Sequence, residues 1–328
     1  RLTLGRVCET ASNWFVQRAR ASQLTPWPQT WKGRPIKMLS RSASQLTPLC
    51  TQVRGMATLK DISIRLKAVT NIQKITKSMK MVSAAKYARA EKELKPARPY
   101  GKGAQAFFEK ADVQQDEKQP NHLMVAITSD RGLCGATHSN IVKAIRAKAQ
   151  SLPAGTEFRI IPVGDKAKAM LQRQYGKHIL MHFTEVGRKP PTFLDASEIA
   201  NAILNCGFQY DFGEMYYNIF KSVVAYNTTT MPIFTQDKVA NAEKISIYDS
   251  VDEDVLQCYN EFALVSLITF AQKEGATSEQ SQRMTAMDAA SKNAGEMIDK
   301  LTLSYNRTRQ AVITRELIEI ISGAAALK

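Results

Sequence analysis

Apolar side chains recur every three or four residues along residues 57–110, the first segment with a clear periodic pattern. This spacing is typical of one face of a long helix near the coiled-coil period, and the segment has no glycine or proline before Pro96. Thr58 is the expected N-cap, with Asp61 in capping-box position, whereas Pro96 and Pro99 are expected to interrupt or kink the helix. The predicted stripe consists of Ile62, Leu66, Val69, Ile72, Ile75, Met79 and Val82.

Between residues 120 and 250, short apolar runs rich in β-branched side chains alternate with helical patterns. This alternation predicts an α/β domain, Rossmann-like, with a largely parallel sheet. The expected strands are 123–128, 158–163 and 214–224, with a further candidate at 182–186, and the expected helices run to about residue 150, over 165–175 and over 195–205.

Residues 252–328 have a helical composition throughout, and no proline follows Pro232. A helix of about 70 residues would be roughly 105 Å long, so it is expected to project from any domain of this size. Its last turns are apolar on nearly every side, which is typical of a buried helix, and we expect another protein to bury them. The stripe expected to face the first helix is Ala294, Met297, Leu301, Tyr305, Thr308 and Val312.

Together these patterns predict a protein of the α/β class. A long antiparallel coiled coil of N- and C-terminal helices, 57–110 and 252–328, carries the central α/β domain of residues 120–250 on its side.

The formal net charge of +15 is concentrated near the N-terminus. Residues 1–56 hold nine basic side chains and one acidic, in a segment rich in Ser, Thr and Gln. This composition indicates a mitochondrial transit peptide, and Arg54 lies three residues before a plausible cut between Met56 and Ala57. A chloroplast transit peptide and a retained arm that binds nucleic acid are the alternatives.

Residues 57–100 hold eleven basic and three acidic side chains. A concentrated basic stripe indicates an acidic partner, and a protein assembly or nucleic acid would satisfy it. No aromatic side chain interrupts the basic residues before Tyr87, so a stacking platform for single strands is not predicted. A solvated basic face is the simplest alternative.

No pattern for catalysis or metal binding stands out. The loop 128–135 follows a predicted strand but lacks the spacing and the lysine of a phosphate-binding loop. Cys134 and His138 stand four residues apart without an orienting third group, and His178 and His182 are separated by a probable strand boundary. We therefore expect no catalytic residue, no metal and no cofactor. A small nucleotide-binding α/β enzyme and a basic coiled coil that binds nucleic acid remain the rival classes.

Four sequence motifs resemble the gamma subunit of F-type ATP synthase, over the whole stretch from Ala57 to the C-terminus. The last of them follows the pattern I-T-x-E-x-x-E-x-x-x-G-A, which is highly specific to that family, and the animal mitochondrial form is the most similar. The motifs are Asn71–Val82, Ser129–Gly135, Asn306–Ala311 and Ile313–Ala326.

The resemblance implies the central-stalk rotor of a proton-translocating ATP synthase, which performs no chemistry itself. Its implied partners are three alpha and three beta subunits around the helix pair, and the delta and epsilon subunits and the c-ring beside the α/β domain. The implied location is the matrix side of the mitochondrial inner membrane, as a peripheral protein, with neither nucleic acid nor a small-molecule substrate as partner.

The resemblance also implies partner-contact residues. Arg309 and Gln310 match the family's catch, which meets a polar acidic loop of one beta subunit. Ile320, Ile321 and Leu327 belong to the apolar tip, which suits a bearing sleeve. The remaining expected contacts are Arg131, Lys74, Lys77, Met79 and Lys80.

Overall fold

The computed structural model describes residues 58–113, 119–153, 155–242, 244–245, 248 and 252–327. These residues all belong to one compact unit, Met56–Lys328. The predicted transit segment 1–56 and the cut between Met56 and Ala57 lie outside the described residues.

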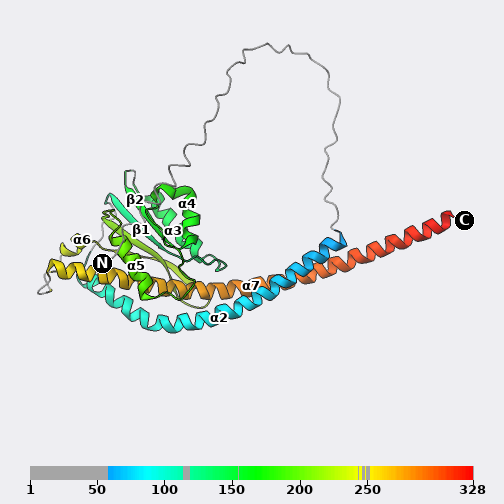
Figure 1. Cartoon of the computed structure of the whole chain (residues 1–328), viewed down its shortest axis with the longest axis horizontal. Helices are drawn as coiled ribbons and strands as arrows, with labels where there is room; N and C mark the ends of the chain where they lie inside the picture. Colours follow the sequence, from blue (N-terminus) through cyan, green and yellow to red (C-terminus); the bar gives the residue numbers. More distant parts are fainter. Residues whose placement is uncertain are drawn as a thin grey trace, which may run out of the picture. The chain divides into compact units, whose positions relative to one another are not determined.

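Two long helices form an antiparallel pair, α2 (Leu59–Lys110) and α7 (Glu253–Ala326) (Figure 1). The hydrogen bonds between the helices run in opposite residue order. Tyr259, near the start of α7, donates to the backbone oxygen of Ala104 near the end of α2, and Asp288, later in α7, accepts from Lys80, earlier in α2. Thr58 caps α2 through the predicted capping box with Asp61. The pairing confirms the predicted antiparallel coiled coil.

Pro96 and Pro99 lie inside α2, which continues through both, so they do not interrupt the helix. The alternative, a bend in the helix, agrees with the curved course of α2 (Figure 1). Each proline removes one backbone N–H donor from the helix. Both are exposed, so the carbonyl groups that lose a partner face water. Close packing holds this stretch of α2 against α7: a Cβ built on Gly101 would come within 2.5 Å of the Phe270 ring.

The face that α2 presents to α7 differs from the predicted stripe. From residue 70 to about residue 83, the buried positions of the seam include small and polar side chains, namely Gln73, Thr76, Lys80 and Ser83. Ile72, Ile75 and Val82 are instead more than half exposed, at 52%, 57% and 56%. Three successive steps of three residues, from Leu66 to Ile75, rotate the apolar stripe around a helix of 3.6 residues per turn and carry it off the seam. On α7 the same kind of shift leaves Met297 exposed and puts Ile298 in its place.

The central domain has a four-stranded sheet in the order β2–β1–β3–β4. β1 is parallel to β2 and β3, and β4 is antiparallel to β3. The predicted α/β class with a largely parallel sheet is therefore confirmed. The elements are β1 (Asn121–Ile127), α3 (Thr137–Ser151), β2 (Glu157–Val163), α4 (Asp165–Tyr175), η1 (Gly176–His178), α5 (Phe193–Leu204), β3 (Phe212–Phe220), β4 (Tyr226–Ile233) and α6 (Gln236–Ala240).

Two strand predictions need correction. Residues 182–186 form no strand and make only one bridge, between Phe183 and Val163. The predicted strand 214–224 ends at Phe220, because the chain turns at 221–225 into β4, which the sequence pattern did not reveal.

The sheet is covered on both faces. One face packs against α5 and the first half of α7, through Leu264, Leu267 and Ile268 among others. The other face packs against α3 and α4, with Ile141, Ile145 and Leu171 fully buried. The first half of α7 is thus part of the domain core, and only its second half extends away from it (Figure 1). No helix within the described residues is long and apolar enough to cross a bilayer.

Candidate partner-contact surfaces

The last turns of α7 form an exposed apolar tip. α7 continues past the beginning of α2 (Figure 1), and every described residue from Ile313 onward is exposed. The large apolar side chains of this tip are exposed by about half or more of their surface: Ile313 48%, Leu317 52%, Ile318 58%, Ile320 68%, Ile321 65% and Leu327 90%. Nothing in the described chain covers them, although such surface is normally buried against a partner.

Arg309 and Gln310 lie one turn before the tip and are both exposed. Their neighbours Thr308 and Val312 are half-buried on the stripe that faces α2. Within the described residues, Arg309 forms no ion pair with Glu316, and the ion pair of this stretch joins Arg315 to Glu319, with 2.9 Å between Nε and Oε1. In the part of the chain that the structure describes, the guanidinium of Arg309 is therefore exposed and unpaired.

Three of the predicted contact residues share a groove between the two helices. Lys74, Lys77 and Lys80 line a cavity of about 530 Å³ together with Asp288 of α7. Lys74 and Lys77 are exposed, whereas Lys80 pairs with Asp288 across the seam at 2.6 Å. This hydrogen bond, followed by one from Lys292, lowers the pKa of the Asp288 carboxyl. The groove thus offers two uncommitted ammonium groups and one that is already paired.

Met79 and Arg131 lie apart from that groove. Met79 is half-buried on α2 and is not among the lining residues. Arg131 is exposed on the loop 128–136 between β1 and α3, where it lowers the pKa of Lys86 by charge repulsion, second to the burial of that lysine.

The loop 128–136 is a structural turn. His138 donates through Nε2 to the backbone oxygen of Arg131 at 3.0 Å, and Thr137 donates to the Cys134 sulfur at 2.9 Å. Burial raises the pKa of the Cys134 thiol and lowers that of His138. A neutral thiol that is not hydrogen-bonded to the histidine is no activated nucleophile.

The two histidines at positions 178 and 182 lie in different surroundings. His178 stacks on Phe158 with the ring centroids 4.2 Å apart, while His182 Nε2 lies 2.7 Å from Lys168 Nζ. In the described part of the chain, no group of three or more His, Cys, Asp or Glu side chains could hold a metal.

Sequence reasoning missed a buried polar joint between the helix pair and the sheet. Glu274 of α7 is almost fully buried, and its carboxylate accepts from Arg98 of α2 and from the backbone N–H of Phe220. Arg98 also donates to the backbone oxygen of Phe220 at 2.6 Å. The one available signal was a glutamate inside the apolar stretch of α7, but its partner is 176 residues away in the chain.

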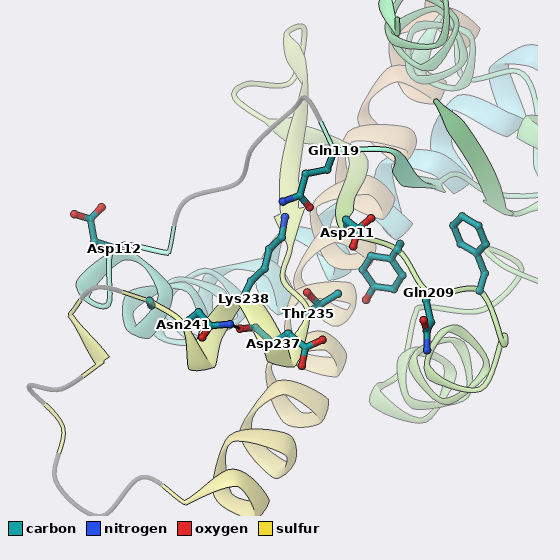
Figure 2. Close-up of a pocket in the computed structure, with 11 residues that line it drawn as sticks. Asp112, Gln119, Gln209, Asp211, Thr235, Asp237, Lys238 and Asn241 are labelled. Carbon is teal, nitrogen blue, oxygen red and sulfur yellow. Dashed lines mark hydrogen bonds between the residues drawn. The ribbon is translucent and has the colours of Figure 1, made fainter. Parts of the chain in front are cut away.

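An open cavity of about 560 Å³ lies at the opposite end of the sheet from the loop 128–136, between α6 and the segment before β3 (Figure 2). Lys238 points toward Gln119 in it, and three carboxylates line it: Asp112, Asp211 and Asp237. Asp211 accepts from Asn121, and Asp112 pairs with Lys244. Two of the carboxylates thus hold neighbouring segments in place.

Comparison with known proteins decides the family. A family model described as "ATP synthase" matches residues 58–327. A mitochondrial ATP synthase gamma subunit from Drosophila melanogaster is 63% identical over 292 residues, which cover 89% of the chain and 98% of that relative. The chain belongs to the gamma subunits of ATP synthase. The corresponding subunit of Rattus norvegicus is 58% identical over 272 residues, 83% of the chain and the full length of that relative.

Solved structures agree with this family. A structure of the central stalk and c-ring of the Tetrahymena thermophila mitochondrial ATP synthase matches 66% of the chain and 99% of its own, with a TM-score of 0.58 and 27% identity. A Euglena gracilis mitochondrial ATP synthase chain shares the fold over 82% of this chain and 94% of its own, with a TM-score of 0.69 and 20% identity.

As a gamma subunit, the chain is the central-stalk rotor subunit of the mitochondrial ATP synthase. It is a non-catalytic subunit of a complex that as a whole makes ATP. The resemblance noted in the sequence motifs is thereby confirmed. The roles of individual contact residues stay predictions.

Proposed function

We propose that this gamma subunit turns inside a ring of three alpha and three beta subunits, with the tip of α7 as its bearing. The exposed apolar tip carries the proposal, because isoleucine and leucine side chains at 48–90% exposure need a partner to bury them. The apolar residues that α2 turns away from its seam, Ile72, Ile75 and Val82, add a second surface of the same kind.

The proposed coupling follows from the asymmetry of the shaft. One curved helix pair presents a different face to each of three identical catalytic sites, so the sites differ in nucleotide affinity at any moment. As the helix pair rotates, each catalytic site takes on the three nucleotide affinities in turn. The rotation of the helix pair and nucleotide binding at the catalytic sites are thus linked by a coupling free energy. The joint of Arg98, Glu274 and Phe220 would hold the helix pair to the α/β domain while torque passes between them.

Exposed polar side chains of the helix pair are proposed to contact the surrounding alpha and beta subunits. Arg309 offers five N–H donors in a fixed fork, and Gln310 adds an amide beside it, which suits an acidic loop of one beta subunit. The proposed further contacts with the alpha and beta subunits are Lys74, Lys77, Lys80, Met79 and Arg131.

The α/β domain is proposed to meet the delta and epsilon subunits and the c-ring, which would make the chain peripheral on the matrix side of the inner membrane. Residues 1–56 are proposed to be a transit peptide that is removed before Ala57. The basic, acid-poor composition of that segment supports this assignment.

Co-purification tests the bearing proposal. Native chain should be recovered with alpha and beta subunits in a 3:3:1 ratio, the ratio that the family implies. Changing Ile320→Asp together with Ile321→Asp should lower the recovered complex, because burying two carboxylates in an apolar sleeve is costly. The matched control, Ile320→Leu with Ile321→Leu, should assemble normally. Equal recovery of both variants would contradict the bearing role of the tip.

A further inference from the structure

A second, smaller cavity lies where α2, α7 and the loop 187–191 meet. Its volume is about 150 Å³. Lys86 and Arg89 of α2 and Lys189 of the loop line it, and Ala90 and Ala276 contribute apolar surface. We call it the basic cavity.

The cations of the basic cavity outnumber the carboxylates that could neutralise them. Glu93 is already paired with Lys273 at 2.5 Å, and Glu279 is paired with the buried Arg283. Within the described residues, no hydrogen bond or ion pair engages the side chains of Lys86, Arg89 or Lys189. Three uncommitted cations therefore line a cavity whose two carboxylates, Glu93 and Glu279, are already paired with other cations.

The surroundings of Lys86 add to this imbalance. Burial lowers the pKa of its ammonium, and the charges of Arg131 and Arg283 lower it further, against an opposing effect of Glu279. Bringing an anion into the cavity would offset this repulsion between cations.

Behind the basic cavity lies a smaller one of about 30 Å³, which shares Gly187, Ala276 and Glu279 with it. Gln272 and His138 line this inner space and are only 4% and 8% exposed. Both amide atoms of Gln272 and Nδ1 of His138 have no hydrogen-bond partner among the residues that the structure describes. Buried polar atoms of this kind are normally satisfied, and the volume suits one water molecule. The inner space would thus hold a water that a ligand in the basic cavity could contact.

We propose that the basic cavity binds a small phosphate-bearing anion of the size of orthophosphate or pyrophosphate. The volume supports this class of ligand, since sites for drug-sized or nucleotide-sized molecules are about 300–1,000 Å³. Lysine and arginine donors on two separate segments, α2 and the loop 187–191, suit an anion with several acceptor oxygens. Such a ligand would bridge α2 and the loop, with Ala276 of α7 forming part of the wall.

Calorimetric titration of the purified full chain with pyrophosphate tests the site. Lys86→Gln with Arg89→Gln should weaken binding by about tenfold or more, because each removes a charge-assisted hydrogen bond. The matched control is Lys95→Gln with Lys102→Gln, which removes the same net charge from exposed positions of the same helix and should bind as the unmodified chain does. Equal weakening by both pairs would show diffuse attraction to a basic surface and overturn the proposal.

A variant that keeps every charge tests the shape of the site. Ala276→Leu should abolish pyrophosphate binding by filling the cavity, while circular dichroism and the melting temperature confirm that the variant is folded. Retained binding in a folded Ala276→Leu chain would overturn the proposal. So would an unmodified chain that binds no pyrophosphate and binds only an acidic peptide, or only vesicles of anionic phospholipid. None of these outcomes bears on the bearing role of the α7 tip.

Discussion

Arg98 of α2 and Glu274 of α7 are joined by a 2.7 Å contact between Nε and Oε1, and the same carboxylate accepts from the backbone N–H of Phe220 at 2.9 Å. One buried carboxylate thus fastens both long helices to the end of β3. Because the acid is 1% exposed, its charge depends on these partners and not on water.

Replacing Arg98 tests that joint. Arg98→Ala leaves the Glu274 carboxylate with one donor, so we expect a loss of about 1.5–3 kcal/mol in the free energy of unfolding, the range for a hydrogen bond to a charged group. Urea unfolding of the full chain measures it, with Lys102→Ala on the exposed face of α2 as control. An Arg98→Ala chain that unfolds at the same urea concentration as the control would show that the joint adds nothing to stability.

The ion pair of Asp288 with Lys80 and Lys292 predicts a pH dependence. The folded-state pKa of Asp288 is lowered, so its contribution is fully present above the unfolded pKa of about 3.9 and is lost as the pH falls through the folded value. Asp288→Asn should therefore lower the urea midpoint at pH 7, and the difference should shrink toward pH 3. A difference that does not change over this range would refute the pairing as its cause.

The chain alone should not bind MgATP with micromolar affinity. Hydrogen bonds from Thr137 and His138 hold the loop after β1 in a turn, and its sequence lacks the spacing and the lysine of a phosphate-binding loop. Calorimetry with MgATP checks this, and any weak heat should vanish in the Lys86→Gln, Arg89→Gln variant if it arises at the basic cavity. Micromolar binding that survives this variant would favour a nucleotide site in the α/β domain.

Processing is the next expectation. The charge change at Ala57 predicts a mature N-terminus at Ala57 or within a few residues of it. Mass spectrometry of the protein isolated from mitochondria determines that terminus directly. A mature chain that still contains Arg18 and Arg20 would rule out a transit peptide in this segment.

Arg309→Ala should slow the assembled enzyme without unfolding it. Arg309 is exposed and takes part in no ion pair with Glu316, so its loss should leave helix content unchanged. A contact made in one rotor position and broken in the next is worth about 1.5–3 kcal/mol, and each ~1.4 kcal/mol of lost contact lowers turnover about tenfold.

Steady-state ATP hydrolysis and synthesis should fall together in that variant. Arg309→Lys should restore only part of the rate, since lysine lacks the bidentate fork. Arg307→Ala, on the same exposed helix, is the matched control. If the assembled Arg309→Ala enzyme turns over at the wild-type rate, the predicted contact of Arg309 is wrong, and Arg309 is a solvated helix residue.

The sequence predicted the helices better than the faces they use. Period defined α2, helical composition defined α7, and the capping box defined the start of α2, because all three depend on residues close in the chain. The choice of seam did not follow from hydrophobicity: Gln73 and Thr76 face α7 while Ile72 and Ile75 face outward. Apolar residues on the outer face are understandable if a partner outside the chain covers them.

Other features escaped prediction for related physical reasons. β4 was missed because only Met231 and Ile233 of its residues are buried, which leaves little periodic pattern. Of the expected contact residues, Lys74, Lys77 and Lys80 share a face because their spacing dictates it. Asp288 as the partner of Lys80 could not be foreseen, since 208 residues separate them.

Observation of rotation tests the central claim most directly. Cys258 is a free, exposed thiol near the start of α7, where a bead can be attached in the assembled complex of alpha, beta and gamma subunits. During ATP hydrolysis by a surface-held complex, the bead should turn in one direction in three equal steps per revolution, as three identical sites around one shaft require. A bead that stays still while the same complexes hydrolyse ATP would contradict the rotor account.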